Sequence, residues 1–391
     1  MTLFSFYKPL FFGYLVTPFI LSSGLYTLAM APLAAITVWR IPSKKLFAFI
    51  LPLLLVFLIS THGLWSSFTY YEVFKDFWYL LNPLLAFYVG CFFYLALSRQ
   101  DFYYIFCIAG IFLALMHLAY FAINPEVLSL GGRDIRDLGV KGNHIIPFTV
   151  ALLLWGGTGR LFHLRLEALL FAVFLLIISV ALSFSRTGWL ILIFSLFVYF
   201  EFYRKPALIL FLVLIVLILS FLVVGGYETN NPLLNKFMNP TSEFIQFDNW
   251  NIYDINNNWR GYENFLTREV LENASFLTQL FGFGAGYSLP LDVTIKLGGD
   301  VHSEIFILHS AYSYLLLKTG IIGVLLYLFF LLHLFYIAIR ARDMEARSVL
   351  VIAGIIFFTS FAISGLYNKV QAIPFMIFLG CSINIFWERK R

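Results

Sequence analysis

The sequence predicts an all-α polytopic membrane protein with about twelve transmembrane helices and one large polar loop that contains short helices. Hydrophobic residues make up 61% of the 391 residues and charged residues only 12%, and the mean hydropathy is +0.87. A soluble core cannot use so much apolar surface. The apolar runs are continuous rather than alternating, which favours helices over a membrane β-barrel.

Apolar runs that can cross a membrane recur along the whole chain, each approaching the roughly 20 residues that a span needs. We expect spans near residues 9–22, 24–39, 46–61, 77–97, 102–123, 144–160, 164–184, 187–203, 206–225, 320–340, 347–364 and 369–387. The first run is too long for a cleaved signal peptide and has no small-residue cleavage site, so we expect it to be retained.

These spans divide the chain into three regions. Residues 1–225 hold the first nine helices and a short periplasmic loop near 124–143. Residues 226–319 form the large periplasmic loop with the candidate active site. Residues 320–391 hold the last three helices and a cytoplasmic tail.

Basic residues are unequally divided between the two sides of these spans. Fifteen lie on one side: Lys8, Arg40, Lys44, Lys45, Arg99, Arg160, Arg165, Arg204, Lys205, Arg340, Arg342, Arg347, Arg389, Lys390 and Arg391. The short loops opposite hold six: Lys75, Arg133, Arg136, Lys141, Arg186 and Lys369. Basic loops stay in the cytoplasm, so we expect both termini there and the large loop in the periplasm of a bacterial inner membrane. The net charge of +5 therefore reflects topology, and no nucleic-acid partner is expected.

The large loop is where chemistry is expected, because most other residues are lipid-facing Leu, Phe and Ile. A helical pattern runs from Trp259 to Leu280 and ends at a glycine-rich run, Gly282-Phe-Gly-Ala-Gly286. A second short helix is expected from His309 to Thr319, lying at the outer interface before Gly320 turns the chain inward. The loop has two arginines and two histidines, the groups that hold an anionic leaving group and activate a hydroxyl.

Three arginines are candidates for binding a diphosphate, because a planar guanidinium binds phosphate oxygens through paired hydrogen bonds. Arg186 lies between two apolar runs in Ser183-Phe-Ser-Arg-Thr-Gly-Trp189, where an arginine is costly unless it is paired or faces a wet cavity. The alternative for Arg186 is snorkelling to headgroups. Arg260 opens the loop's helical stretch, Arg268 follows two turns later as its rival, and either could be a solvated surface residue.

His309 is the candidate general base, because imidazole suits proton transfer near neutral pH. A lone histidine is more often a packed or capping residue, and His302 is the second candidate. Glu304, Glu263 and Glu269 could act as bases or orient His309, although exposed carboxylates in loops are usually only solvated.

Other features point more weakly to a site. His144 follows a short polar loop and could line the same cavity or simply pack. The glycine-rich run lacks the following Lys-Ser/Thr of a phosphate-binding loop, which favours a structural turn. Cys91, Cys107 and Cys381 lie within predicted spans without disulfide or zinc spacing, so we expect buried thiols and no metal or other cofactor.

At these residues the chain resembles the superfamily of bacterial O-antigen ligases and polymerases. Three stretches carry the resemblance: Ser185-Arg186-Thr-Gly-Trp at a span start, Arg260 heading a helix that leads to the glycine-rich run, and His309-Ser310 followed by Gly320 and Gly323. Their order and the large outer loop before the last three spans also match. The resemblance covers roughly residues 140–340. The Trp often found one turn after the family's loop arginine is absent, which leaves Arg260 and Arg268 as rival counterparts.

The resemblance implies an inverting, metal-independent glycosyl transfer from an undecaprenyl-diphosphate-linked glycan. Arg186 and Arg260 would bind the diphosphate, and His309 would take the proton of the acceptor hydroxyl. In a polymerase the acceptor is another lipid-linked repeat unit, whereas in a ligase it is lipid A–core. The high Phe content, 46 residues, favours the polymerase.

Membrane lipids and a chain-length regulator protein are further expected partners. The competing class is a transporter of lipid-linked oligosaccharides. A transporter should show charged or broken spans in matching halves, whereas the polar residues here gather in one asymmetric loop.

Overall fold

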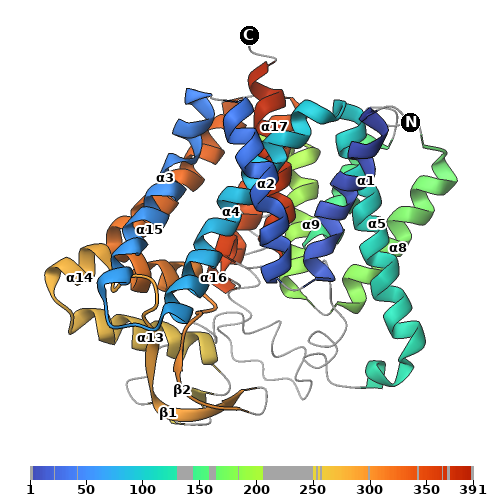
Figure 1. Cartoon of the computed structure of the whole chain (residues 1–391). Coiled ribbons are helices and arrows are strands. Elements are labelled where there is room, and N and C mark those ends of the chain that lie inside the picture. Colours follow the sequence, from blue (N-terminus) through green and yellow to red (C-terminus); the bar gives the residue numbers. More distant parts are fainter. Residues whose placement is uncertain are drawn as a thin grey trace.

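The computed structural model describes residues 3–21, 23–41, 43–129, 144–157, 164–183, 185–205, 250–251, 254–255, 258–297, 300–340, 343–362, 364–367 and 370–388. In these residues the chain is a bundle of helices with a small helix-and-hairpin layer at one end (Figure 1). The bundle helices are α1 (Leu3–Val16), α2 (Ser23–Arg40), α3 (Lys44–Ser60), α4 (Tyr70–Ala96), α5 (Arg99–Ile123), α7 (Ile145–Gly156), α8 (Leu166–Leu182), α9 (Arg186–Tyr199), α15 (Ala311–Arg340), α16 (Met344–Ala362) and α17 (Ala372–Glu388).

The other elements are short helices and one pair of strands. The 3-10 helices are η1 (Thr17–Phe19), η2 (Thr61–Trp65), η3 (Pro125–Ser129), η4 (Phe202–Arg204) and η6 (Gly365–Tyr367). The polar region contributes α13 (Trp259–Glu272), α14 (Phe276–Phe281), β1 (Leu289–Leu297) and β2 (Asp300–Ile305).

Each predicted span overlaps a helix, except residues 206–225, which lie outside the described residues. By length and composition, five helical segments in the described chain can cross a membrane: Lys44–Trp65, Tyr70–Ala96, Arg99–Ile123, Ala311–Ile339 and Met344–Phe361. Helices α7, α8, α9 and α17 are apolar but shorter. The helices thus indicate a membrane protein, while twelve crossings, their orientation and the three-region division remain predictions.

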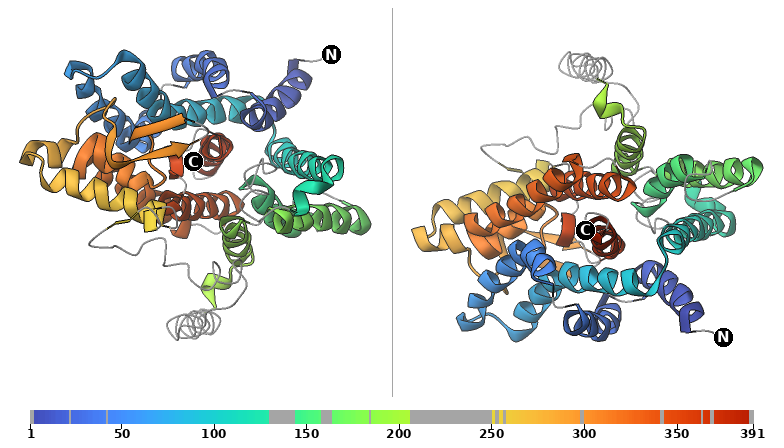
Figure 2. Two further views of the ribbon diagram at one scale, coloured as in Figure 1. Left: turned by 90° about the horizontal axis from the view of Figure 1, so that it is seen from below. Right: turned by 90° about the horizontal axis from the view of Figure 1, so that it is seen from above.

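Helix α17 lies near the middle of the bundle (Figure 2) and is buried from Ala372 to Phe386. Its crossing with α4 is close because both helices have glycine there: a Cβ at Gly90 would collide with the Ile377 carbonyl, and one at Gly380 with the Phe87 carbonyl. Small residues allow such close approach between helices in membranes. On α5, the ring centroid of Phe106 lies 4.6 Å from that of Phe378 in α17.

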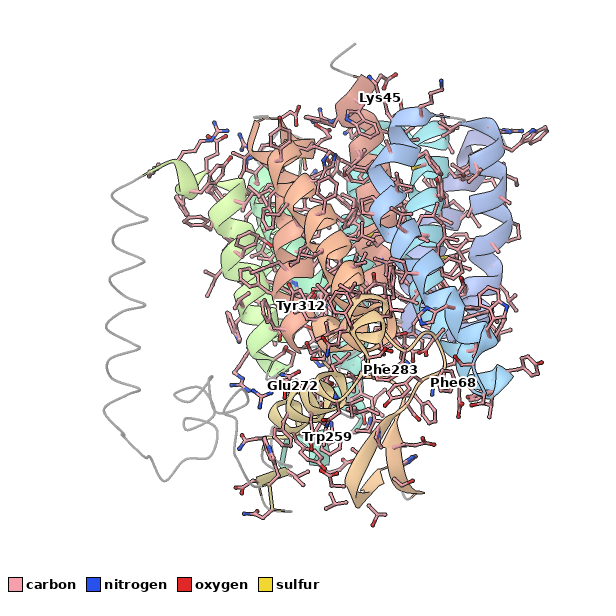
Figure 3. All side chains as sticks on the ribbon, turned by 90° about the vertical axis from the view of Figure 1, so that its left-hand side faces the viewer. Lys45, Phe68, Trp259, Glu272, Phe283 and Tyr312 are labelled. Atoms are coloured by element: carbon pink, nitrogen blue, oxygen red, sulfur yellow. The ribbon has the colours of Figure 1, made fainter. Side chains whose placement is uncertain are left out.

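The two ends of the bundle differ. The loop end carries α13, α14 and the β1–β2 hairpin, whereas at the far end α1 begins and α17 ends (Figure 1). Figure 3 shows the same division, with Lys45 at the far end and Trp259 and Glu272 at the loop end.

The hairpin corrects the all-α prediction for the loop. Strands β1 and β2 are antiparallel, with Leu289 opposite Ile305 and Ile295 opposite His302, and the register shifts between Pro290 and Ile295. Alternating Leu and Val residues in β1, followed by two glycines, were the sequence signal for a hairpin.

A glycine clasp, Gly282–Gly286, joins this layer to the bundle. Helix α15 breaks at Gly320 (φ 64°, ψ −165°), which separates the short helix 311–319 from the long one, as predicted. The N–H groups of Phe283 and Gly284 donate to the carbonyls of Leu317 (2.8 Å) and Lys318 (3.1 Å). These bonds satisfy carbonyls that the break leaves without helical partners.

The next two residues extend the clasp to other helices. Ala285 donates to the Ser60 carbonyl at the end of α3 (2.9 Å), and Gly286 donates to the Asp76 carboxylate in α4 (2.7 Å). Four successive N–H groups therefore tie the loop to three helices. Because these donors are occupied, the glycine-rich run is a structural turn rather than a phosphate-binding loop.

Candidate active site at the loop end

His309 is held by a buried carboxylate. Its ring Nδ1 lies 2.9 Å from Oε1 of Glu263 on α13, and its backbone N–H donates to Oε2 of the same carboxylate at 3.0 Å. The Glu263 side chain is 1% exposed, whereas that of His309 is 51% exposed. Trp259, one turn before Glu263, donates its indole N–H to Oε1 at 2.8 Å.

These contacts determine which ring nitrogen can react. An ionised carboxylate only accepts hydrogen bonds. Nδ1 of His309 therefore carries the ring hydrogen and donates a hydrogen bond to Glu263. Nε2 of the neutral ring is then left with a lone pair. A half-exposed histidine with a fixed ring and a basic Nε2 can act as a general base.

Helix α13 also bonds to the residues that follow His309. Ser313 donates to the side-chain oxygen of Asn264 at 2.5 Å. A helix turns about 100° per residue. Viewed along the axis of α13, half-buried Arg260 therefore points between the directions of Glu263 and Asn264, and it lies one turn before them in the helix. Arg260 is therefore on the face of α13 that meets the His309 segment.

Arg268 lies outside that sector of α13. Its side chain is exposed, and its Nε is 3.5 Å from Oε1 of Glu272 in an exposed i,i+4 ion pair. Between the two loop arginines, the helical geometry favours Arg260 as the neighbour of His309.

The connection after α16 holds the carbonyl side of the His309 segment. Ser364 donates its N–H to the carbonyl of His309 (2.5 Å) and its hydroxyl to the carbonyl of Leu308 (2.8 Å). Ser364 has a positive φ of 59°, a conformation uncommon for residues other than glycine. Glu263 on one side and Ser364 on the other therefore position His309.

Arg186 lies at the same end of the bundle. Helices α9 and α16 run antiparallel, since Tyr199 bonds to Ser348 (2.9 Å) and Phe194 packs beside Gly354. Continuing this pairing puts Arg186 level with the end of α16, from which the chain leads to Ser364.

Arg186 is also the first residue of α9, next to its cap. The Ser185 hydroxyl accepts the N–H of Gly188 at 3.2 Å, which is the usual serine cap. A helix N-terminus carries partial positive charge, which adds to the guanidinium charge. Arg186 is half-buried, and this combination favours an anion.

The remaining candidates do not join His309. His302 and Glu304 lie in β2, where Glu304 accepts a hydrogen bond from Ser288. Within the described residues, the hydrogen bonds of His309 go to Glu263 and Ser364 instead. His144 is buried directly before α7.

A buried ion pair at the loop end was missed by sequence analysis. Lys318 of α15, with no exposed side-chain surface, lies 2.5 Å from the Asp76 carboxylate of α4, which is 2% exposed. Asp76 also accepts the Tyr314 hydroxyl at 3.0 Å, and Lys318 donates to the Tyr287 carbonyl. No local pattern indicates this pair, because its partners are 242 residues apart.

Comparison with known families supports the resemblance read from the motifs. Residues 171–328 match the family model described as O-antigen ligase. This segment of the chain is therefore similar to the O-antigen ligase family. The matched segment includes Arg186, α13, the hairpin and His309, and it excludes His144. A search of curated proteins found no match.

The family match supports an activity of the O-antigen ligase and polymerase type. It implies lipid-linked glycans as substrates and membrane lipids as surroundings. It does not distinguish the ligase from the polymerase.

Proposed function

We propose that this protein is an O-antigen or similar surface-polysaccharide polymerase of the bacterial inner membrane. It would transfer an undecaprenyl-diphosphate-linked glycan to a hydroxyl of another lipid-linked repeat unit, on the periplasmic side and without a metal. The observation that carries this proposal is the His309–Glu263 pair: a fixed, half-exposed imidazole with Arg260 on the adjoining helix face.

The reaction is a single displacement that inverts the sugar. The acceptor oxygen attacks the anomeric carbon while the bond from that carbon to the diphosphate breaks. Nε2 of His309 takes the acceptor proton, and Glu263 stabilises the resulting imidazolium, as a carboxylate does in a catalytic triad.

The bonding electron pair leaves with the lipid diphosphate, so negative charge grows there in the transition state. Arg186 and Arg260 are the groups proposed to hold it. Such preorganised cations stabilise charge that develops during the reaction, which is the role that a metal ion would otherwise have.

The test is reconstitution of the full chain in proteoliposomes with one lipid-linked repeat unit, with and without lipid A–core. We expect a ladder of products without added core. Product that appears only with core would instead identify a ligase. Movement of the lipid-linked unit across the bilayer without any product would indicate the transporter.

The same assay tests the residues. His309→Ala should lower turnover by roughly 10²–10⁴-fold, the usual contribution of a general base, and thereby abolish the ladder. Arg186→Ala should abolish the ladder as well. His302→Ala is the matched control because this histidine lies in the hairpin, and it should retain activity. Normal activity of an inserted His309→Ala variant would overturn the mechanism.

A further inference from the structure

Helix α14 exposes a large apolar surface in the otherwise polar loop. Its sequence, Phe276-Leu-Thr-Gln-Leu-Phe281, has no charged residue, and Phe276 and Leu277 are 71% and 67% exposed. Neighbouring exposed apolar side chains of this kind are typical of a surface that contacts a membrane or another protein.

The height of α14 along the bundle is fixed by the break in α15. A Cβ at Gly320 would collide with the carbonyl of Leu280, and a Cβ at Gly282 would collide with the backbone of Thr319. Because backbone atoms of the two segments are in direct contact there, the position of α14 along α15 is fixed.

The exposed stripe of α15 shows where this height lies relative to a membrane. The stripe consists of Ile321, Leu325, Phe329, Leu332, Tyr336 and Ile339, all more than a third exposed. At 1.5 Å per residue the stretch from Ile321 to Ile339 is about 27 Å long, close to the ~30 Å hydrocarbon thickness of a bilayer. The hydrocarbon boundary at the loop end therefore falls next to Gly320, where α14 packs.

Helix η2 presents a similar surface at the same height. It ends α3, and a Cβ at Gly63 would collide with the Ala285 backbone in the clasp. Trp65 is 82% exposed and Leu64 is exposed beside it. Figure 2 shows α14 projecting outward from the bundle beyond α15, and Figure 1 shows it at the level where the neighbouring helices end.

We propose that α14 and η2 form a membrane anchor, in which Leu64, Trp65, Phe276, Leu277 and Phe281 insert into the interfacial layer of the leaflet at the loop end. Lipid is the occupant because these side chains are uncharged and lie at the height where the exposed stripe of α15 ends. Trp is also the residue that favours the membrane–water interface.

The anchor has a consequence for the site, which rests on the proposed function. Helix 311–319 leaves the boundary at Gly320. At 1.5 Å per helical residue, and about 3.3 Å for each of the two residues before the helix, His309 lies at most about 20 Å beyond that boundary. Headgroups occupy the layer just outside the hydrocarbon. The anchor would thus hold the base near the level where the diphosphate of a lipid-linked donor lies.

The anchor can be tested by spin labelling of the full chain in liposomes of phosphatidylethanolamine and phosphatidylglycerol. A nitroxide is attached to Leu277→Cys, and a second sample carries it on Glu272→Cys, an exposed position on α13. The native thiols Cys91, Cys107 and Cys381 are buried, and the unsubstituted chain serves as the labelling control. Accessibility to oxygen and to a water-soluble nickel chelate then gives the depth.

We expect the label at residue 277 to favour oxygen over the nickel chelate and to lie within about 10 Å below the headgroups. The label at residue 272 should favour the nickel chelate. A label at residue 277 that is as accessible to nickel as the one at 272 would overturn the proposal. Shielding from both reagents would also overturn it, because it would indicate a protein partner. Neither result depends on glycosyltransferase activity.

Discussion

Each end of the bundle has a buried carboxylate that binds a basic side chain, but the two basic side chains differ in type and in exposure. At the far end, fully buried Glu345 of α16 accepts two hydrogen bonds from Arg99 of α5, at 2.5 and 3.2 Å. At the loop end, Glu263 is equally buried but holds a histidine whose side chain is half exposed.

The choice of base decides what each pair can do. An arginine is always charged and donates hydrogen bonds through the N–H groups of its planar fork, so the Arg99–Glu345 pair joins two helices without a group that can exchange a proton near neutral pH. A histidine can accept and release a proton near neutral pH. The comparison teaches that burial of a carboxylate creates a reactive group only where its partner titrates and remains open to solvent.

The largest expected effect comes from Asp76→Ala, which leaves Lys318 buried and unpaired. Removing one partner of a buried ion pair costs about 3–5 kcal/mol. Denaturant unfolding in detergent micelles should show this loss in the free energy of unfolding. The double variant Asp76→Leu with Lys318→Met removes both charges and should recover much of it. If the single variant were as stable as the double, the pair would not join α4 to α15 as described.

The next effect separates the two ends directly. Glu263→Gln keeps the shape of the side chain but replaces a charge-assisted hydrogen bond, worth about 1.5–3 kcal/mol. This loss corresponds to a roughly 10–150-fold fall in kcat. KM for the donor should change little. Steady-state kinetics on reconstituted enzyme measure both constants.

Glu345→Gln is the matched control at the far end. It should lower the free energy of unfolding and leave kcat per folded molecule unchanged. Equal effects of the two variants on kcat would remove the distinction between the ends.

The smallest effect is expected for Arg268→Ala. Its ion pair with Glu272 is exposed on both sides, and such pairs contribute about 0–1 kcal/mol. Polymerisation rates should therefore change less than about fivefold. Arg260→Ala, on the face that meets His309, should raise KM for the donor by about tenfold or more. The reverse order of effects would assign the diphosphate to Arg268.

The helices are predictable from the sequence because their signal is local. A continuous apolar run marks a helix wherever it occurs, and the prediction of a break at Gly320 is confirmed by its positive φ. Helix ends were less accurate: the run predicted for 144–160 gives a helix only from Ile145 to Gly156.

The candidate site was predictable in its residue types but not in its pairing. His309, Arg186 and Arg260 were proposed from their order and chemistry, and their roles stay predictions. Glu263 was one of three candidate carboxylates, and only the packing of α13 against the His309 segment selects it. The Asp76–Lys318 pair had no local signal, because it depends on how distant helices pack.

The clasp and the Ser364 contact together determine when this site can exist during biosynthesis. Gly286 finds Asp76 at a separation of 210 residues, and His309 is held by a serine that follows α16. Contacts between distant residues form late in folding, and chains emerge from the ribosome N-terminus first. A growing chain that already contains Arg186, Arg260 and His309 therefore still lacks the serine that holds the His309 carbonyl. Under the proposed function, the base would be fully positioned only after α16 and the residues after it have entered the bundle, so a half-made chain would not act on its substrates.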